Sequence, residues 1–112
     1  MGRILYVDEA QAEWRVSPLK PGMKEGDPRV RSKHLVGGAD GVPRVIIAEY
    51  EPGHREPRHS HAESEVLYIL DGDATIEGTV VRPGTVVFVE GATEYGPVVS
   101  GEHGVRFLRV EV

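Results

Sequence analysis

Cysteine is absent from the 112-residue chain. Its absence excludes disulfide-stapled scaffolds, iron–sulfur clusters, thiolate zinc sites and cysteine nucleophiles, and it fits an intracellular protein best. Any bound metal would therefore have nitrogen and oxygen ligands. Basic residues are also scarce, since 13 Lys and Arg stand against 18 Asp and Glu and give a net charge of −5. A chain with this charge balance is not expected to bind nucleic acid or an anionic membrane surface.

Long hydrophobic runs are missing as well. The first apolar run covers only residues 4–7, which is too short for a signal peptide or a membrane-spanning segment. We therefore expect a cytoplasmic protein with no membrane association. The length suits one domain with a hydrophobic core of its own.

Valine outnumbers alanine, and 14 glycines and 8 prolines supply frequent turn signals. This composition favours strands over helices, and only residues 10–14 are predicted to form a helical turn. The predicted strands cover residues 3–7, 30–36, 44–50, 65–70, 74–77, 80–82, 85–89, 95–99 and 105–112. Short strands at this spacing are typical of an all-β fold, either a sandwich or a barrel closed from two sheets.

Two parts of the chain differ in regularity. Prolines and glycines interrupt the sequence up to residue 28, so residues 1–28 are predicted to form an N-terminal arm and residues 29–112 the β-domain. Within that domain the segment 44–50 is apolar at both alternating sets of positions. A strand of this kind lies between two packed surfaces.

The residues that carry chemistry are concentrated between Gly53 and Gly72. His59 and His61 are two positions apart, so their side chains share one face of an extended segment, and Glu65 has the same parity. Two imidazoles and one carboxylate form a donor set that suits a divalent first-row metal. Such a set leaves coordination positions free for water, oxygen or substrate.

The spacing of Gly53, His59, His61, Glu65 and Gly72 resembles the first motif of the cupin superfamily at every fixed position. The resemblance implies a small single-domain cupin, in which residues 29–112 form a jelly-roll β-barrel with a metal near its centre. It also implies that His59, His61 and Glu65 are metal ligands. By the same resemblance we expect a homodimer, paired through the arm 1–28 or through strand 3–7.

The second cupin motif is degenerate in this chain. Its first glycine is matched by Gly84, but Tyr95 stands where the family has a further histidine ligand. Tyr95 is therefore a candidate phenolate ligand, hydrogen-bond donor, acid–base group or wall residue. His34, on the parity of Val30 and Val36, is a second candidate for the missing ligand or for a base. His54 and His103 are expected to lie in solvated loops.

Three functions fit these residues. The first is an oxygenase in which Fe(II), or else Mn, Ni or Cu, binds a small organic substrate and oxygen. The second is an isomerase, lyase or cyclase in which Zn²⁺ or Ni²⁺ acts as a Lewis acid while Tyr95 or His34 moves a proton. The third is a metal-binding or small-ligand-binding module without catalysis, for which the degenerate second motif is the argument.

Overall fold

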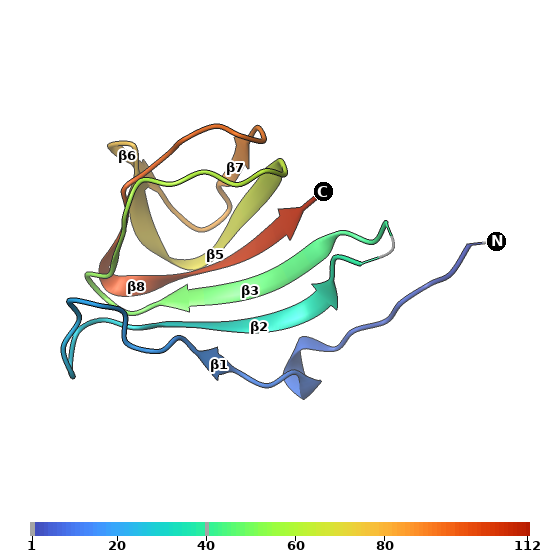
Figure 1. The fold of residues 1–112 in the computed structure, drawn as a ribbon, viewed down its shortest axis with the longest axis horizontal. Coiled ribbons are helices and arrows are strands. Elements are labelled where there is room, and N and C mark those ends of the chain that lie inside the picture. The colour runs from blue at the N-terminus through green and yellow to red at the C-terminus, as the bar shows by residue number, and fades with distance from the viewer. Residues whose placement is uncertain (1, 40) are drawn as a thin grey trace.

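The computed structural model describes residues 2–39 and 41–112, and nearly all of its regular structure is β (Figure 1). One 3₁₀ helix, η1 (Glu9–Gln11), precedes the strands. The strands are β1 (Arg15–Val16), β2 (Val30–Gly37), β3 (Arg44–Tyr50), β4 (Arg55–Glu56), β5 (Glu65–Ile76), β6 (Thr79–Val81), β7 (Val86–Val89) and β8 (Val98–Glu111). The described residues include no helix that is long and apolar enough to cross a membrane.

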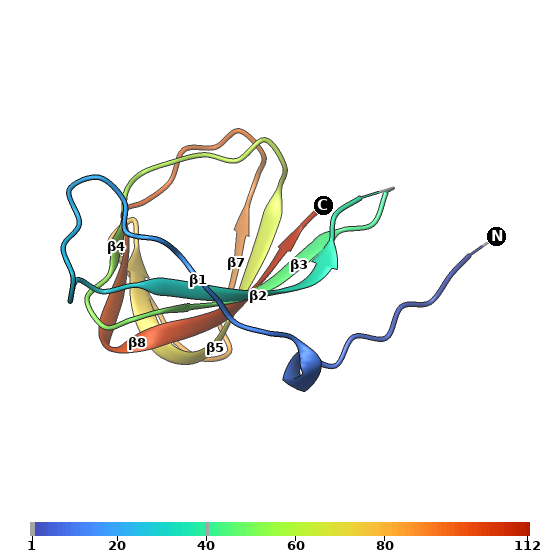
Figure 2. The same cartoon turned by 60° about the horizontal axis from the view of Figure 1, so that its bottom comes forward.

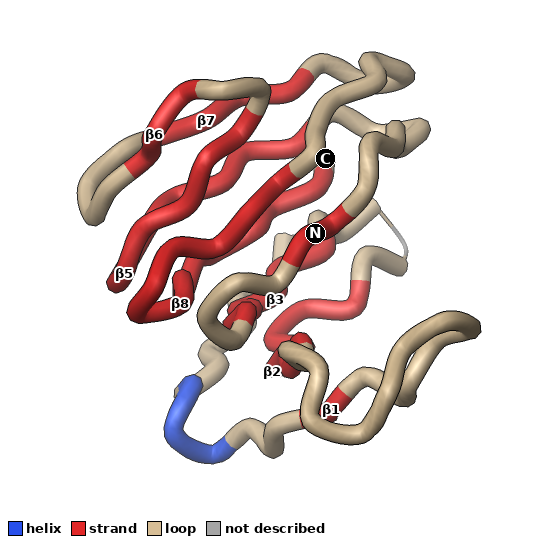
Figure 3. Tube along the Cα trace, turned by 90° about the vertical axis from the view of Figure 1, so that its left-hand side faces the viewer, coloured by secondary structure: helices blue, strands red, loops and turns tan. Residues whose placement is uncertain are grey.

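All strand pairs are antiparallel, and the strands belong to one sheet that rolls up into a barrel. Their order is β1-β2-β3-β8-β5-β6, with β4 paired to β8 and β7 paired to β5. Figure 3 shows the strands following one another from β1 at one edge to β6 and β7 at the other. The segments 51–64 and 90–97 run side by side across the top of the barrel (Figures 1 and 2). The predicted cupin-type β-barrel is confirmed.

The core of the barrel forms along the paired strands β5 and β8. Glu65, Leu67 and Ile69 alternate along β5 and are all buried, with the outward residues between them more exposed. Ile69 lies opposite Phe107 of β8, and both side chains point into the barrel. The inward face of β5 thus carries an acidic residue, Glu65, directly above an apolar floor.

Strand β3 is buried on both faces, as its sequence predicts. Its central residues, Ile46, Ile47 and Ala48, are all buried. On the outer face Ile47 pairs with Lys33 of β2, whose ammonium lies 2.6 Å from Glu9 and 4.8 Å from the centre of the Trp14 ring. Residues 9–14 of the arm therefore cover the outside of the sheet, which explains why this strand has no polar face.

The largest differences between the structure and the predicted elements are in three places. Residues 3–7, which were expected to be a strand, belong to no strand and leave Ile4 and Tyr6 exposed. The expected turns at 71–73 and 100–104 are irregularities inside the long strands β5 and β8. They face each other so closely that a Cβ on Gly72, whose φ is +71°, would overlap the carbonyl oxygen of Gly104.

Candidate metal centre

The segment that carries the two motif histidines is held by the loop that precedes β8. His59 and Tyr95 form an isolated antiparallel bridge, with N···O distances of 3.0 and 2.9 Å in the two directions. The backbone N–H of Ala92 donates to the carbonyl of His61 at 2.7 Å. The first motif and the degenerate second motif therefore meet in space, and Tyr95 is fixed opposite His59.

Glu65 is the most secluded charged residue of the site, with 1% of its surface exposed. Its Oε1 accepts a hydrogen bond from the Tyr95 hydroxyl. Burial of Tyr95, reinforced by this hydrogen bond and by the negative charge of Glu65, raises the pKa of the phenol far above its ordinary value of 10. In this structure Tyr95 is thus a protonated donor that orients the carboxylate.

The second oxygen of Glu65 and an imidazole nitrogen face each other without a partner. Glu65 Oε2 lies 4.0 Å from His61 Nε2, and within the described part of the chain both atoms are buried and form no hydrogen bond. The gap is too wide for a hydrogen bond. Two ligands of one ion, each bonded at about 2.1 Å, stand roughly 3–4 Å apart. These orphaned atoms therefore fit a shared metal ion.

His59 is the third candidate ligand and lies beside this pair. Its ring centre is 4.8 Å from that of His61 and 4.8 Å from that of Tyr95. Its Nδ1 lies 2.8 Å from the carbonyl oxygen of Pro57, which assigns the proton to Nδ1 and leaves Nε2 free to bind a metal. Among residues 2–39 and 41–112, no three His, Asp or Glu side chains already stand at the spacing of a complete metal centre.

His34 does not join this cluster. The strand register places it opposite Ile46, on the face that also carries Arg109, as its parity predicts. Its side chain is nevertheless exposed, and its Nε2 forms a hydrogen bond with Ser32 Oγ at 3.4 Å. Partial burial, with the charges of Arg15, Arg44 and Arg109, lowers the pKa of His34. This placement gives no support to His34 as a replacement ligand.

A pocket of about 240 Å³ opens directly in front of the motif histidines. Its wall on one side consists of arm residues from the loop between β1 and β2, which lies beside β4 in Figure 2. The residues that line it are Ser17, Pro18, Lys20, Met23, Arg29, Val30, Tyr50, His54, Glu56, His59, His61 and Arg109. The cavity beneath, between Leu67, Ile69 and Phe107, measures only about 20 Å³, so a ligand has room above the histidines and not below them.

Two residues of this pocket were not expected from the sequence. His54, expected in a solvated loop, packs its ring 4.8 Å from that of Tyr50, and its Nε2 lies 3.0 Å from Glu56 Oε2. Arg109 Nε lies 3.8 Å from Glu65 Oε2. The signal for Arg109 was available, because it shares the inward parity of Val105 and Phe107 in the last strand.

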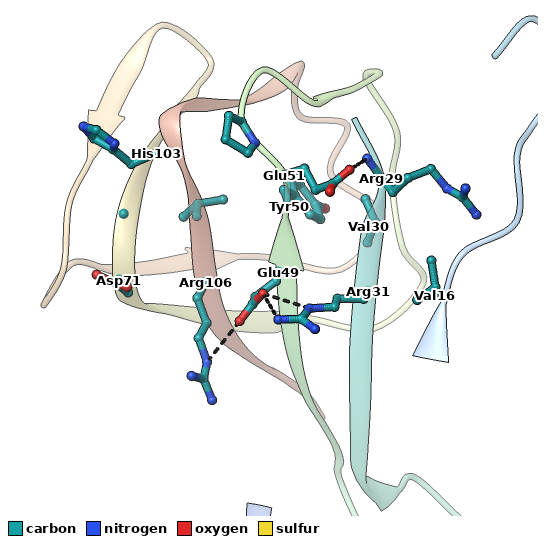
Figure 4. Close-up of a pocket in the computed structure, with 13 residues that line it drawn as sticks. Val16, Arg29, Val30, Arg31, Glu49, Tyr50, Glu51, Asp71, His103 and Arg106 are labelled. Carbon is teal, nitrogen blue, oxygen red and sulfur yellow. Dashed lines mark hydrogen bonds and ion pairs between the residues drawn. The ribbon is translucent and has the colours of Figure 1, made fainter. Parts of the chain in front are cut away.

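A larger hollow of about 480 Å³ lies on the outer face of the sheet (Figure 4). Its charges neutralise one another: Glu49 is 2.7 Å from Arg31 and 3.9 Å from Arg106, and the backbone N–H of Arg29 donates to Glu51 at 2.6 Å. None of the candidate metal ligands His59, His61 and Glu65 lines it. The pocket at the histidines is therefore the better candidate for a functional site.

Comparison with known proteins agrees with this fold. The model of the Cupin domain family matches residues 46–111, which contain both motifs. The chain belongs to the cupin family. Cupin proteins commonly bind divalent metals.

Relatives add a range of named activities. The chain is 34% identical over 97 residues to dimethylsulfoniopropionate lyase DddW from Ruegeria pomeroyi, a match that covers 80% of the chain and 63% of that protein. It therefore spans less than two thirds of the length of this relative. One similar solved structure is KdgF from Halomonas sp., with a TM-score of 0.75 and 16% identity, and the match covers 97% of this chain and 93% of KdgF. Another is the polyketide cyclase RemF from Streptomyces resistomycificus, with a TM-score of 0.74 and 24% identity, and the match covers 97% of this chain and 79% of RemF. At these identities the two structures show the fold alone.

Proposed function

We propose that this cupin is a metal-dependent enzyme whose ion is held by His59, His61 and Glu65 and whose substrate is a small organic molecule. The observation that carries the proposal is the pair of orphaned atoms, His61 Nε2 and Glu65 Oε2, 4.0 Å apart beside the pocket. Leaving a buried carboxylate oxygen and an imidazole nitrogen without partners costs several kcal/mol. A divalent ion bound between them removes that cost.

Lyase-type or cyclase-type chemistry has more support than the oxygenase that the motif first indicates. A relative with 34% identity is a lyase, and a similar structure is a cyclase. In such reactions the bound metal acts as a Lewis acid that polarises a substrate oxygen. The chain supplies Tyr95, which donates to Glu65 and orients it, and the arm loop, whose Lys20 and Met23 line the pocket.

The identity of the metal is a separate part of the proposal. Two imidazoles and a carboxylate can bind Fe(II), Mn, Ni, Cu or Zn. The relative affinities of such a site are set more by the metal than by the protein, so the donor set does not select one of these metals. Turnover of a trial substrate such as dimethylsulfoniopropionate by zinc-loaded protein under nitrogen supports the lyase. Oxygen uptake by iron-loaded protein supports the oxygenase instead, and metal binding with neither supports a binding module.

The metal content of purified variants tests the site itself. We expect about one divalent ion per wild-type chain and less than a tenth of that in His59→Ala. His103→Ala is the matched control, because His103 is exposed and lies outside the pocket. Equal metal content in wild type and His59→Ala would refute the assigned ligands.

We further infer a homodimer. The outer faces of β5 and β7 carry apolar side chains that the chain leaves exposed, namely Tyr68, Leu70, Val86 and Phe88. Tyr68 and Val86 lie directly opposite each other, so these residues form one continuous patch. Residues 4–7 are also apolar and exposed. A second copy of the chain is the partner that could cover both.

A further inference from the structure

We propose that the metal pocket accepts a small organic anion and that Arg109 binds its carboxylate group. This proposal rests on the metal site proposed above, and it specifies the class of substrate. Arg109 is the cation nearest to the proposed ligands, since its Nε lies 3.8 Å from Glu65 Oε2. It lines both the open pocket and the small cavity beneath it, so it stands where a bound molecule would contact the metal.

Arg109 has a hydrogen-bond donor that the described residues leave unused. Its Nε is buried and has no hydrogen-bond partner in the described residues. The nearest carboxylates, those of Glu65 and Glu111, lie at 3.8 and 3.4 Å, whereas charged hydrogen bonds are about 2.7–2.9 Å long. A guanidinium has five donors in a planar fork that matches a carboxylate. A carboxylate ligand would complete these bonds.

Metal binding makes this cation more available. Without a metal, Arg109 is the counter-charge closest to Glu65 Oε2, while Glu65 Oε1 is occupied by Tyr95. A metal ion bound to Glu65 takes over the negative charge of that carboxylate. Arg109 would then be a partly buried cation whose one remaining carboxylate neighbour among the described residues is Glu111, at 3.4 Å, and incomplete pairing of a cation in such a position is costly. An anionic ligand bound to Arg109 would neutralise this positive charge.

The pocket as a whole has the opposite charge to the rest of the molecule. The chain carries a net charge of −5, yet the pocket is lined by Lys20, Arg29 and Arg109 against one carboxylate, Glu56. A positive cleft in an acidic protein attracts anions and repels cations. In the outer hollow of Figure 4, by contrast, Arg29, Arg31 and Arg106 are matched by Glu49, Glu51 and Asp71.

The dimensions of the pocket restrict the anion to a small one. Its volume of about 240 Å³ lies below the usual 300–1,000 Å³ of drug-sized ligand sites. The packed side chains of Leu67 and Phe107 close its floor. A short-chain organic acid fits this space, with its carboxylate on Arg109 and its remaining polar atoms toward the histidines.

Calorimetric titration with propionate and with its neutral analogue propionamide tests the proposal. We expect metal-loaded wild-type protein to bind propionate at least tenfold more tightly than propionamide. Because a carboxylate can also contact the metal directly, the decisive comparison is Arg109→Met, in which propionate affinity should fall at least tenfold. Arg82→Met is the matched control, since Arg82 is exposed and lies outside the pocket, and it should bind propionate as wild type does.

Metal content and melting temperature are measured on the same samples. Propionate affinity within twofold of wild type in a folded, metal-containing Arg109→Met protein would overturn the proposal and leave the metal site intact. Equal affinity of wild type for propionate and propionamide would also overturn it, and this comparison does not depend on the folding of a variant. If wild type binds no metal, the proposed enzyme function fails, and the Arg109 proposal is then judged by the same propionate comparison in metal-free protein.

Discussion

Tyr95 orients the carboxylate of Glu65 at the proposed metal site. The phenol donates to Glu65 Oε1 and leaves Oε2 free to face His61. Tyr95→Phe removes the donor and leaves both carboxylate oxygens of a buried group unsatisfied. We expect metal-free Tyr95→Phe to lose about 1–3 kcal/mol of unfolding free energy, measured by urea denaturation, and to bind metal roughly 10–100-fold more weakly.

Tyr95→His is the informative companion to this variant, because it restores the imidazole found at this position in the family motif. We expect it to bind metal at least tenfold more tightly than Tyr95→Phe, because an added imidazole is a ligand and phenylalanine is not. Equal affinities in the two variants would show that residue 95 does not face the ion.

Single residues of this site were predictable from the sequence to different degrees. The spacing of His59, His61 and Glu65 was sufficient to bring them together as candidates, because alternation along an extended segment is a local property. The position of Arg109 depends on its register with Leu67 of β5, which is set by long-range pairing. The sequence shows its inward parity but not its distance from Glu65.

At the scale of elements, the close approach of the paired strands β5 and β8 depends on glycine. Gly72 has a φ of +71°, and a Cβ there would overlap the backbone of Gly104. We expect Gly72→Ala to cost roughly 2–4 kcal/mol, which combines the strain of the left-handed region with the steric overlap. Thermal denaturation measures the loss.

Gly78→Ala provides the matched control for this steric effect. Gly78 has a similar φ of +78°, but a Cβ there would meet no other described atom within 4 Å. Its substitution should cost only about 1–2 kcal/mol, the strain alone. If the two substitutions destabilise the protein equally, the close approach of β5 and β8 is not what requires Gly72.

The docking of the arm on the sheet should depend on pH. The hydrogen bond from Lys33, aided by the charges of Lys33 and Arg106, lowers the pKa of Glu9 below its ordinary 4.5 although partial burial opposes this. A carboxylate with a lowered pKa stabilises the docked arm above pH 4.5, and this contribution is lost as the pH falls through the lowered pKa. Trp14 lies beneath Arg31 and Lys33, so its fluorescence should change below pH 4.5.

Glu9→Gln is the control for this pH effect. It keeps the size of the side chain and removes its titration, so the acid-induced change in Trp14 fluorescence should be absent. A change centred above pH 5 in wild type, or the same change in Glu9→Gln, would contradict the role assigned to the Glu9–Lys33 pair.

The elements themselves were predictable where the signal was local. The limits of β3 agree with the segment 44–50, because its apolar run is bounded by turn residues on one side and by a proline on the other. The turns expected at 71–73 and 100–104 were wrong. The irregularities of β5 and β8 lie opposite each other, so the two strands stay paired on both sides of them and continue without a turn. The expected strand at 3–7 was wrong, because that segment pairs with no strand of the described structure.

At the scale of the whole molecule, the exposed apolar patch on β5 and β7 predicts self-association. Phe88, at 62% exposure, is its most exposed member. We expect light scattering to give twice the mass of the chain at micromolar concentration, and Phe88→Asp to give a monomer with unchanged metal content. Leu19→Asp, an exposed position on the arm, is the control. A wild-type monomer would refute the dimer without affecting the site.

The central claim is that His59, His61 and Glu65 bind a divalent metal in the folded protein. The most direct test is the melting temperature of chelator-treated protein titrated with Fe(II), Mn or Zn, in wild type and in Glu65→Gln. An ion that binds only the native state stabilises it by about 2.7 kcal/mol at 100 times its Kd, which is roughly 10 °C for a domain of this size. We predict such a rise in wild type and little or none in Glu65→Gln. A flat response in wild type, or an equal rise in both proteins, would contradict the metal site.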